Sequence, residues 1–166
     1  MAKEPKKLDD LFHDTLKDVY YAEKHIYAAL PKMAKAAQSS QLKAAFEKHH
    51  KETEGQIARL EKVFGIIDQK PQAKKCNAIE GILDEGKEIM DEYRGSPALD
   101  AGLLAAAQAV EHYEMSRYGT LRTWAEELGH QDAAKLLQAT LNEEEATDKA
   151  LTKLAESVVN QEAEAA

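Results

Sequence analysis

Four long stretches of this 166-residue chain place apolar side chains at every third or fourth position, which is the period of an amphipathic α-helix. They span about residues 8–37, 41–67, 97–128 and 132–159, and no segment shows the strict alternation of a β-strand. Short breaks separate the first stretch from the second and the third from the fourth, so each pair is expected to form an antiparallel hairpin. A chain with this pattern buries its apolar faces by packing the four helices together.

The connection between the two hairpins is longer and contains a shorter predicted helix, at about residues 77–93. Ser96 and Pro97 then supply a cap and a first position for the third long helix. Two hairpins joined by one long crossover are the ferritin-like arrangement. We therefore predict an all-α, ferritin-like four-helix bundle over residues 8–160, with one short extra helix in the crossover. Residues 1–7 are expected to be a flexible N-terminus and residues 161–166 a disordered tail.

Net charge, the length of apolar runs and the cysteine count limit the partners and the compartment expected for this chain. The formal net charge of −8 at pH 7 argues against a nucleic-acid partner, whose phosphates would be repelled. No apolar run approaches the ~20 residues that span a bilayer, and the hydrophilic N-terminus lacks the apolar core of a signal peptide. A single cysteine, Cys76, cannot form an internal disulfide and is typical of a reducing compartment. We expect a cytoplasmic protein that binds neither nucleic acid nor membrane.

Polar side chains interrupt each of the four apolar stripes near its middle. The interruptions are Glu23 in the first stripe, His49, Glu52, Thr53 and Gln56 in the second, Glu111, Glu114 and Arg117 in the third, and Glu144 and Asp148 in the fourth. Within each hairpin the acidic residues lie at similar distances from the turn, so they are expected to face one another at one level of the bundle.

The charge of this level is unbalanced. An ionised carboxylate in an apolar interior costs several kcal/mol unless it is paired or bound to metal. Arg117 is the one base on the same faces as at least four acids, whereas two divalent or trivalent ions would balance the charge. We therefore predict a pair of metal ions, with Glu23, Glu52, Glu114 and Glu144 as core ligands. His49, Glu111 and Asp148 are further candidate ligands, and Gln56 and Arg117 are predicted to orient or balance them.

Taken singly, these residues have simpler interpretations. A lone glutamate such as Glu23 is commonly salt-bridged, and a lone histidine such as His49 is commonly a hydrogen-bonded core residue. Several tyrosines beside the stripes, Tyr118 among them, are interpreted as the edge of the core rather than as a redox relay. The metal prediction depends on the coincidence of acids from four helices at one level.

Several segments of the chain resemble the YciF-type bacterial stress proteins. They are DVYYAEK (18–24), ALPKM (29–33), AFEKH (45–49) with Glu52, Thr53 and Gln56, EHYE (111–114) with YGTL (118–121), and TLNEE (140–144). The resemblance covers about residues 8–160. It implies a ferritin-like fold similar to that of rubrerythrins, an association with general stress response, and a homodimer; it does not imply a defined activity.

The wider di-iron group of this fold usually carries Glu-x-x-His on its second and fourth helices. This sequence has His49-x-x-Glu52 on the second helix, and Asp148 stands where a histidine is expected on the fourth. The predicted site is therefore rich in oxygen ligands, which suits manganese as well as iron.

Three functions follow as hypotheses. The first is a dinuclear iron or manganese protein of bacterial stress response that reacts with oxygen or peroxide, with oxidase-like or peroxidase-like activity. The second is a non-enzymatic structural stress protein whose metal is structural or absent. The third is a mini-ferritin that stores iron in a cage. The sequence names no substrate.

Overall fold

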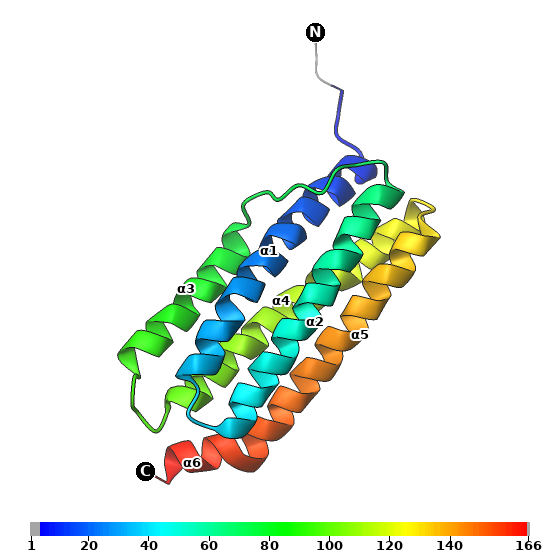
Figure 1. The fold of residues 1–166 in the computed structure, drawn as a ribbon. Helices are drawn as coiled ribbons and strands as arrows, with labels where there is room; N and C mark the ends of the chain where they lie inside the picture. The colour runs from blue at the N-terminus through cyan, green and yellow to red at the C-terminus, as the bar shows by residue number, and fades with distance from the viewer. Residues whose placement is uncertain (1–3, 166) are drawn as a thin grey trace.

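The computed structural model describes residues 4–165, and within that range it contains helices and no β-strand (Figure 1). The elements are α1 (Leu8–Ala36), α2 (Ser40–Ile66), α3 (Asn77–Glu92), α4 (Leu99–Glu127), α5 (Gln131–Leu154), a π-helical turn (Ala155–Val159) and α6 (Asn160–Glu164). The hairpin of α1 and α2 packs against the hairpin of α4 and α5, and α3 lies outside them against α1 and α4. The all-α, ferritin-like bundle with one extra crossover helix is thus confirmed. Along residues 4–165, no helix combines the length and apolar character that crossing a bilayer requires.

Local signals in the sequence set most helix ends. The Ser39 side chain accepts a hydrogen bond from the backbone of Leu42 and so caps α2. Gly129 adopts a φ of 79° at the turn after α4, a conformation that costs a glycine little. The prediction for the start of α4 is two residues early: Ser96 accepts a hydrogen bond from the backbone of Ala98 at 3.1 Å, and the helix begins at Leu99.

The core is divided into two apolar clusters along the bundle axis. One cluster includes Phe12, Leu16 and Leu137, near the α4–α5 turn. The other includes Leu30 and Phe46, near the α1–α2 turn. A layer of buried polar side chains lies between the clusters, and its members are Glu23, His49, Thr53, Gln56, Glu111, Glu114, Thr140, Glu144 and Thr147. Of the polar residues predicted to share one level, Glu52, Arg117 and Asp148 are only partly buried. The others lie in this layer: Glu23, His49, Thr53, Gln56, Glu111, Glu114 and Glu144.

The crossover fixes α3 firmly on the bundle. The backbone N–H of Lys74 donates to the Lys17 carbonyl at 3.2 Å, which ties the crossover to α1. A Cβ atom on Gly102 would lie 2.7 Å from Ile89 Cγ2, so only glycine allows α3 and α4 to approach so closely there. Ile79 of α3 is fully buried. This helix therefore belongs to the packed structure and forms one of its walls.

The C-terminal end differs from the sequence prediction. The apolar period of residues 132–159, which includes Leu151 and Ala155, predicts that Val158 faces inward, but Val159 is the buried valine. The π-helical turn at 155–159 adds one residue to a turn and so shifts the inward position by one. The tail predicted to be disordered from Gln161 is helical through Glu164 in α6, while residue 166 and residues 1–3 lie outside the described range.

Asp100 links the two hairpins at the end of the bundle opposite the N-terminus. Its carboxylate is buried and accepts hydrogen bonds from the backbone N–H groups of Gln38 at 2.8 Å and Ser39 at 2.6 Å. It also lies in the first turn of α4, where a negative charge is favoured by the helix dipole. One side chain thus satisfies the α1–α2 turn and stabilises the start of α4.

We predict that Asp100→Ala lowers the free energy of unfolding by about 3 kcal/mol, because two backbone N–H groups lose a charged and buried acceptor. Asp91→Ala is the matched control, since Asp91 forms an exposed pair with Arg94 whose loss is expected to change stability by less than about 1 kcal/mol. Denaturant unfolding of both variants measures the difference. Equal effects of the two substitutions would contradict the linking role of Asp100.

Candidate metal centre

Four side chains from three helices converge in the polar layer. His49 of α2, Glu111 and Glu114 of α4, and Glu144 of α5 each offer a ligand atom, and these atoms all lie within 4.8 Å of one another. His49 Nε2 lies 3.3 Å from Glu111 Oε1, 4.0 Å from Glu114 Oε2 and 4.0 Å from Glu144 Oε2. Imidazole nitrogen and carboxylate oxygen at such spacing could hold a metal ion.

The remaining long helix of the bundle, α1, adds Glu23 to this group. Its side chain is fully buried, and its Oε1 accepts a hydrogen bond from the hydroxyl of Tyr118. On the α5 side, Glu144 Oε1 accepts a hydrogen bond from Gln56 Nε2. The second oxygen of each carboxylate, Oε2, has no protein partner. Both carboxylates are therefore fixed through one oxygen with the other left available.

Unpartnered polar atoms are concentrated in this layer. Among residues 4–165, eleven buried side-chain nitrogen or oxygen atoms have no hydrogen-bond partner, and nine of them lie here. They are His49 Nδ1 and Nε2, Glu23 Oε2, Glu52 Oε2, Gln56 Oε1, Glu111 Oε2, Glu114 Oε1 and Oε2, and Glu144 Oε2. Buried polar atoms are nearly always satisfied in native proteins, because each unpaired group costs about 1–3 kcal/mol. Nine such atoms in one layer form a group that could hold a ligand.

Burial shifts the acid–base equilibria of the layer. It raises the pKa of Glu23 to about 8, with a further contribution from the charge of Glu144. The pKa values of Glu111 and Glu114 are raised well above their ordinary range by burial and then by the neighbouring carboxylates. Burial also lowers the pKa of the His49 imidazole and outweighs the attraction of Glu144. Without metal, these side chains favour their neutral forms.

The nearest paired cation is Arg59, at the edge of the layer. Its guanidinium donates two hydrogen bonds to Glu143, at 2.7 and 2.5 Å, and a third to Thr140 at 3.2 Å. Burial acts to raise the pKa of Glu143, but the hydrogen bond and charge of Arg59 bring it below its usual value. Gln56 joins this pair to the layer, since its amide donates to Glu143 at 3.2 Å as well as to Glu144. Arg59 is thus committed to Glu143. Among the described residues, no lysine or arginine lies within 4.0 Å of the carboxylates of Glu23, Glu111, Glu114 and Glu144, whereas Glu52 at the rim pairs with Lys48.

Three residues predicted for the site lie apart from the four-residue group. Glu52 is on its rim, with Oε1 2.9 Å from Lys48 Nζ and Oε2 4.0 Å from His49 Nδ1. Asp148 is paired with His112 at 3.1 Å and also accepts a hydrogen bond from the Gln108 side chain. The guanidinium of Arg117, predicted to balance the acids, lies over the ring of Tyr113 at 5.4 Å.

Three residues at the layer were not predicted there. Thr147, not Asp148, is the buried residue that follows Glu144 on α5, because the inward face continues at the third position after Glu144. Tyr118, interpreted as core edge, is fully buried and bonded to Glu23. Arg59 replaces Arg117 as the nearby base. The sequence signal for Arg59 was its position three residues after Gln56, which places both side chains on the same face of α2.

Comparisons with known proteins bear on the family and the fold of the chain. A family model described as Domain of unknown function (DUF892) matches residues 7–164. Protein YciF of Escherichia coli strain K12 is 46% identical over 160 residues, which are 96% of each chain. The resemblance stated from the sequence motifs is therefore confirmed.

Solved structures extend the comparison. The E. coli stress protein YciF has a TM-score of 0.89 at 46% identity, with 94% of this chain and 99% of that chain covered. YcfI of Rhodopseudomonas palustris, described as a candidate structural protein, has a TM-score of 0.87 at 44% identity, with 92% and 97% covered. A protein of Xanthomonas campestris, at 21% identity and a TM-score of 0.75, shares the fold.

We predict that the metal-free protein loses stability as pH rises from about 4.5 to about 8. Glu23 has a pKa of about 8 when folded and 4.5 ordinarily, so over this interval the folded chain retains a proton that the unfolded chain releases. Each retained proton lowers the free energy of unfolding by about 1.4 kcal/mol per pH unit. His49 acts in the opposite sense, but only below its ordinary pKa of 6.5, so the clearest window is pH 6.5 to 8.

Urea unfolding of chelator-treated protein at several pH values measures this slope. Glu23→Gln should flatten it, since the amide has no titrating proton, whereas Glu54→Gln, at an exposed position of α2, should leave it unchanged. Wild-type stability that stays constant or rises between pH 6.5 and 8 would contradict the unpaired state of these carboxylates.

Proposed function

The chain belongs to the DUF892 family, and we propose that it is a dinuclear iron or manganese protein of bacterial stress response that reacts with dioxygen or peroxide. The observation that carries the proposal is the concentration of nine unpartnered buried polar atoms in one layer. A buried carboxylate cluster without a cation is strongly destabilising, and bound metal ions would satisfy both its charge and its lone pairs. The stress role follows from the name of the E. coli relative.

Six side chains would hold the two ions: Glu23, His49, Glu52, Glu111, Glu114 and Glu144. One nitrogen and many carboxylate oxygens suit iron or manganese better than a softer metal. Glu52 is included because its Oε2 is buried, unpartnered and close to His49. Asp148 is left out because its carboxylate already pairs with His112 and accepts a hydrogen bond from Gln108.

Neighbouring side chains position the ligands. Tyr118 and Gln56 each donate to Oε1 of one carboxylate, which directs Oε2 toward the layer. Such supporting hydrogen bonds orient ligands and tune metal affinity. Arg59 holds Glu143, which in turn fixes the Gln56 amide, so the orientation of Glu144 depends on a chain of three contacts.

A bound pair of reduced ions would supply two electrons, which with two protons convert dioxygen to hydrogen peroxide or hydrogen peroxide to two water molecules. The protein contributes a site in which five of the six side chains are buried, while Glu52 at the rim is 25% exposed. Because the carboxylates hold protons in the metal-free state, metal binding should release them, and affinity should rise with pH.

The structural alternative has one specific support, the description of YcfI as a candidate structural protein. In a structural protein, the bound metal would serve only to neutralise the charge of the buried carboxylates. Metal retention alone does not separate the two functions, whereas consumption of dioxygen or peroxide by the reduced, metal-loaded protein does.

We predict that anaerobic addition of Fe(II) or Mn(II) followed by desalting leaves about two ions per chain. Glu144→Gln should lose at least one ion, whereas Glu145→Gln should retain both, because Glu145 is exposed on the same helix. Glu52→Gln should weaken retention and Asp148→Asn should not. Elemental analysis measures the stoichiometry, and wild type without retained metal under either condition would refute the proposal.

From the family resemblance we further propose that the chain forms a homodimer. Light scattering at micromolar concentration should give about twice the chain mass of 18.4 kDa. A monomeric mass would contradict the dimer, and a particle of many chains would instead favour the iron-storage cage.

A further inference from the structure

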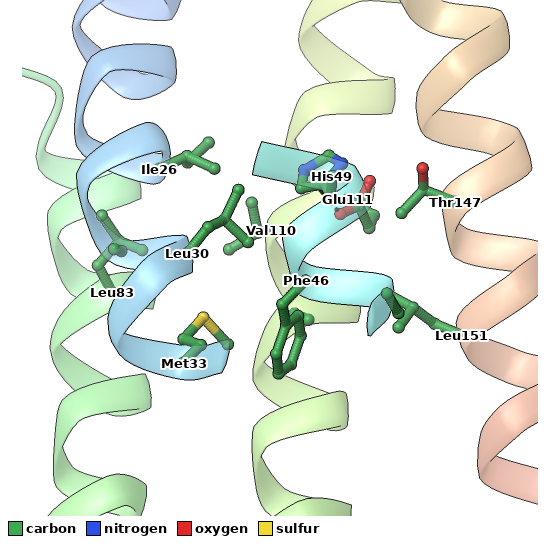
Figure 2. Close-up of a pocket in the computed structure, with 13 residues that line it drawn as sticks. Ile26, Leu30, Met33, Phe46, His49, Leu83, Val110, Glu111, Thr147 and Leu151 are labelled. Atoms are coloured by element: carbon green, nitrogen blue, oxygen red, sulfur yellow. Dashed lines mark ion pairs between the residues drawn. The ribbon is translucent and has the colours of Figure 1, made fainter. Parts of the chain in front are cut away.

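A small apolar chamber adjoins the candidate metal centre (Figure 2). It has a volume of about 20 Å³, and the surface that it exposes is entirely apolar, although His49 and Glu111 form part of its wall. Its remaining wall includes Leu30, Phe46 and Val110. A water molecule needs roughly 10–15 Å³ and two or more polar partners, so this space fits a molecule of diatomic size and offers water little.

A second cavity lies next to the chamber, among α1, α3 and α4. It has a volume of about 160 Å³ and mostly apolar walls, and the exposed residues His25, Lys32 and Lys87 in its lining place it at the surface of the bundle. The two cavities share Ala29, Met33, Leu83 and Val110 as wall residues, so they lie on opposite sides of the same side chains. A displacement of these side chains would join the two cavities into one apolar path.

We propose that this path delivers dioxygen to the metal centre. The inference rests on the proposed function and names its substrate: dioxygen rather than hydrogen peroxide. Dioxygen is apolar and small enough for the chamber. Hydrogen peroxide would have to give up its hydrogen bonds to water there, at a cost of several kcal/mol, because the chamber exposes no polar surface.

The path also gives a function to α3. This helix supplies none of the six proposed ligands, yet its Leu83 stands in the wall of both cavities. Figure 2 shows Leu83 on the side of the chamber away from Thr147 and α5. The crossover helix therefore forms one wall of both cavities, while α2, α4 and α5 carry most of the proposed ligands.

Dissolved dioxygen is paramagnetic, so it can be located in metal-free protein without any reaction. Under dioxygen pressure, methyl groups of Val110 and Leu30 should relax at least roughly threefold faster than those of Leu60 and Leu137, which belong to the other apolar cluster and line neither cavity. All four residues are buried, with at most 6% of the residue exposed. Equal enhancement in the two clusters would overturn the proposal. This readout does not depend on metal, so its failure is distinct from failure to bind metal.

Two substitutions should block the path from different helices. Ala29→Phe on α1 and Leu83→Trp on α3 both fill the shared wall, and each should remove the extra relaxation at Val110. Ala105→Phe, at an exposed position of α4, is the control and should leave it intact. All three variants keep the proposed ligands, so each should still retain metal.

Oxidation kinetics then connect the path with the metals. In protein loaded with Fe(II), the two blocking variants should slow oxidation by dioxygen at least roughly threefold relative to wild type and Ala105→Phe. Oxidation by hydrogen peroxide should change less. If the blocking variants lose the paramagnetic effect but react with dioxygen at the wild-type rate, the cavities do not serve the metals and the proposal is overturned.

Discussion

The constraint on which the structure depends is the placement of several carboxylates in one buried layer without a matching cation. Glu23, Glu111, Glu114 and Glu144 are each at most 1% exposed. Arg59, the nearest base, is engaged by Glu143. Mutual repulsion and desolvation would drive such a layer apart unless protons or metal ions neutralise it. The protein must therefore hold the layer together by interactions outside it.

Those interactions lie on both sides of the layer. One apolar cluster packs the bundle toward the α1–α2 turn, and the other packs it toward the α4–α5 turn. The helices therefore cannot separate at the polar layer without exposing the apolar side chains of one cluster to water. Asp100 adds a polar tie at one end by joining the α1–α2 turn to α4. The stability of the two clusters offsets the cost of the polar layer, which is the usual relation between a preorganised site and its scaffold.

The sequence was sufficient for the fold and for the level of the site, but not for every side chain. Apolar period and turn residues located the helices, and a common distance from each turn placed the acids at one height. Periodicity alone does not decide which of two neighbouring residues faces inward. Each residue turns the helix by about 100°, so the third and fourth residues after Glu144 lie on either side of the inward direction. Helix packing decides between them, and it selected Thr147 over Asp148. On α4 the choice fell the other way: Tyr118, the fourth residue after Glu114, is fully buried, and Arg117, the third, is only partly buried. Val159 is buried in place of Val158 because of a π-helical turn that periodicity cannot reveal.

The surroundings of the layer differ between its two sides, and this difference bears on function. On the α2–α5 side, Arg59, Glu143 and Gln56 form a polar chain that fixes Glu144. On the α1–α3–α4 side, the walls are mostly apolar and line the two adjacent cavities. A purely structural metal would need only the first of these features, because neutralising the core requires ligands and their orientation. Apolar space that reaches the ligands adds nothing to stability, since a cavity forfeits packing contacts. Its presence beside His49 and Glu111 therefore favours a centre that a small apolar molecule visits over one that only stabilises the bundle.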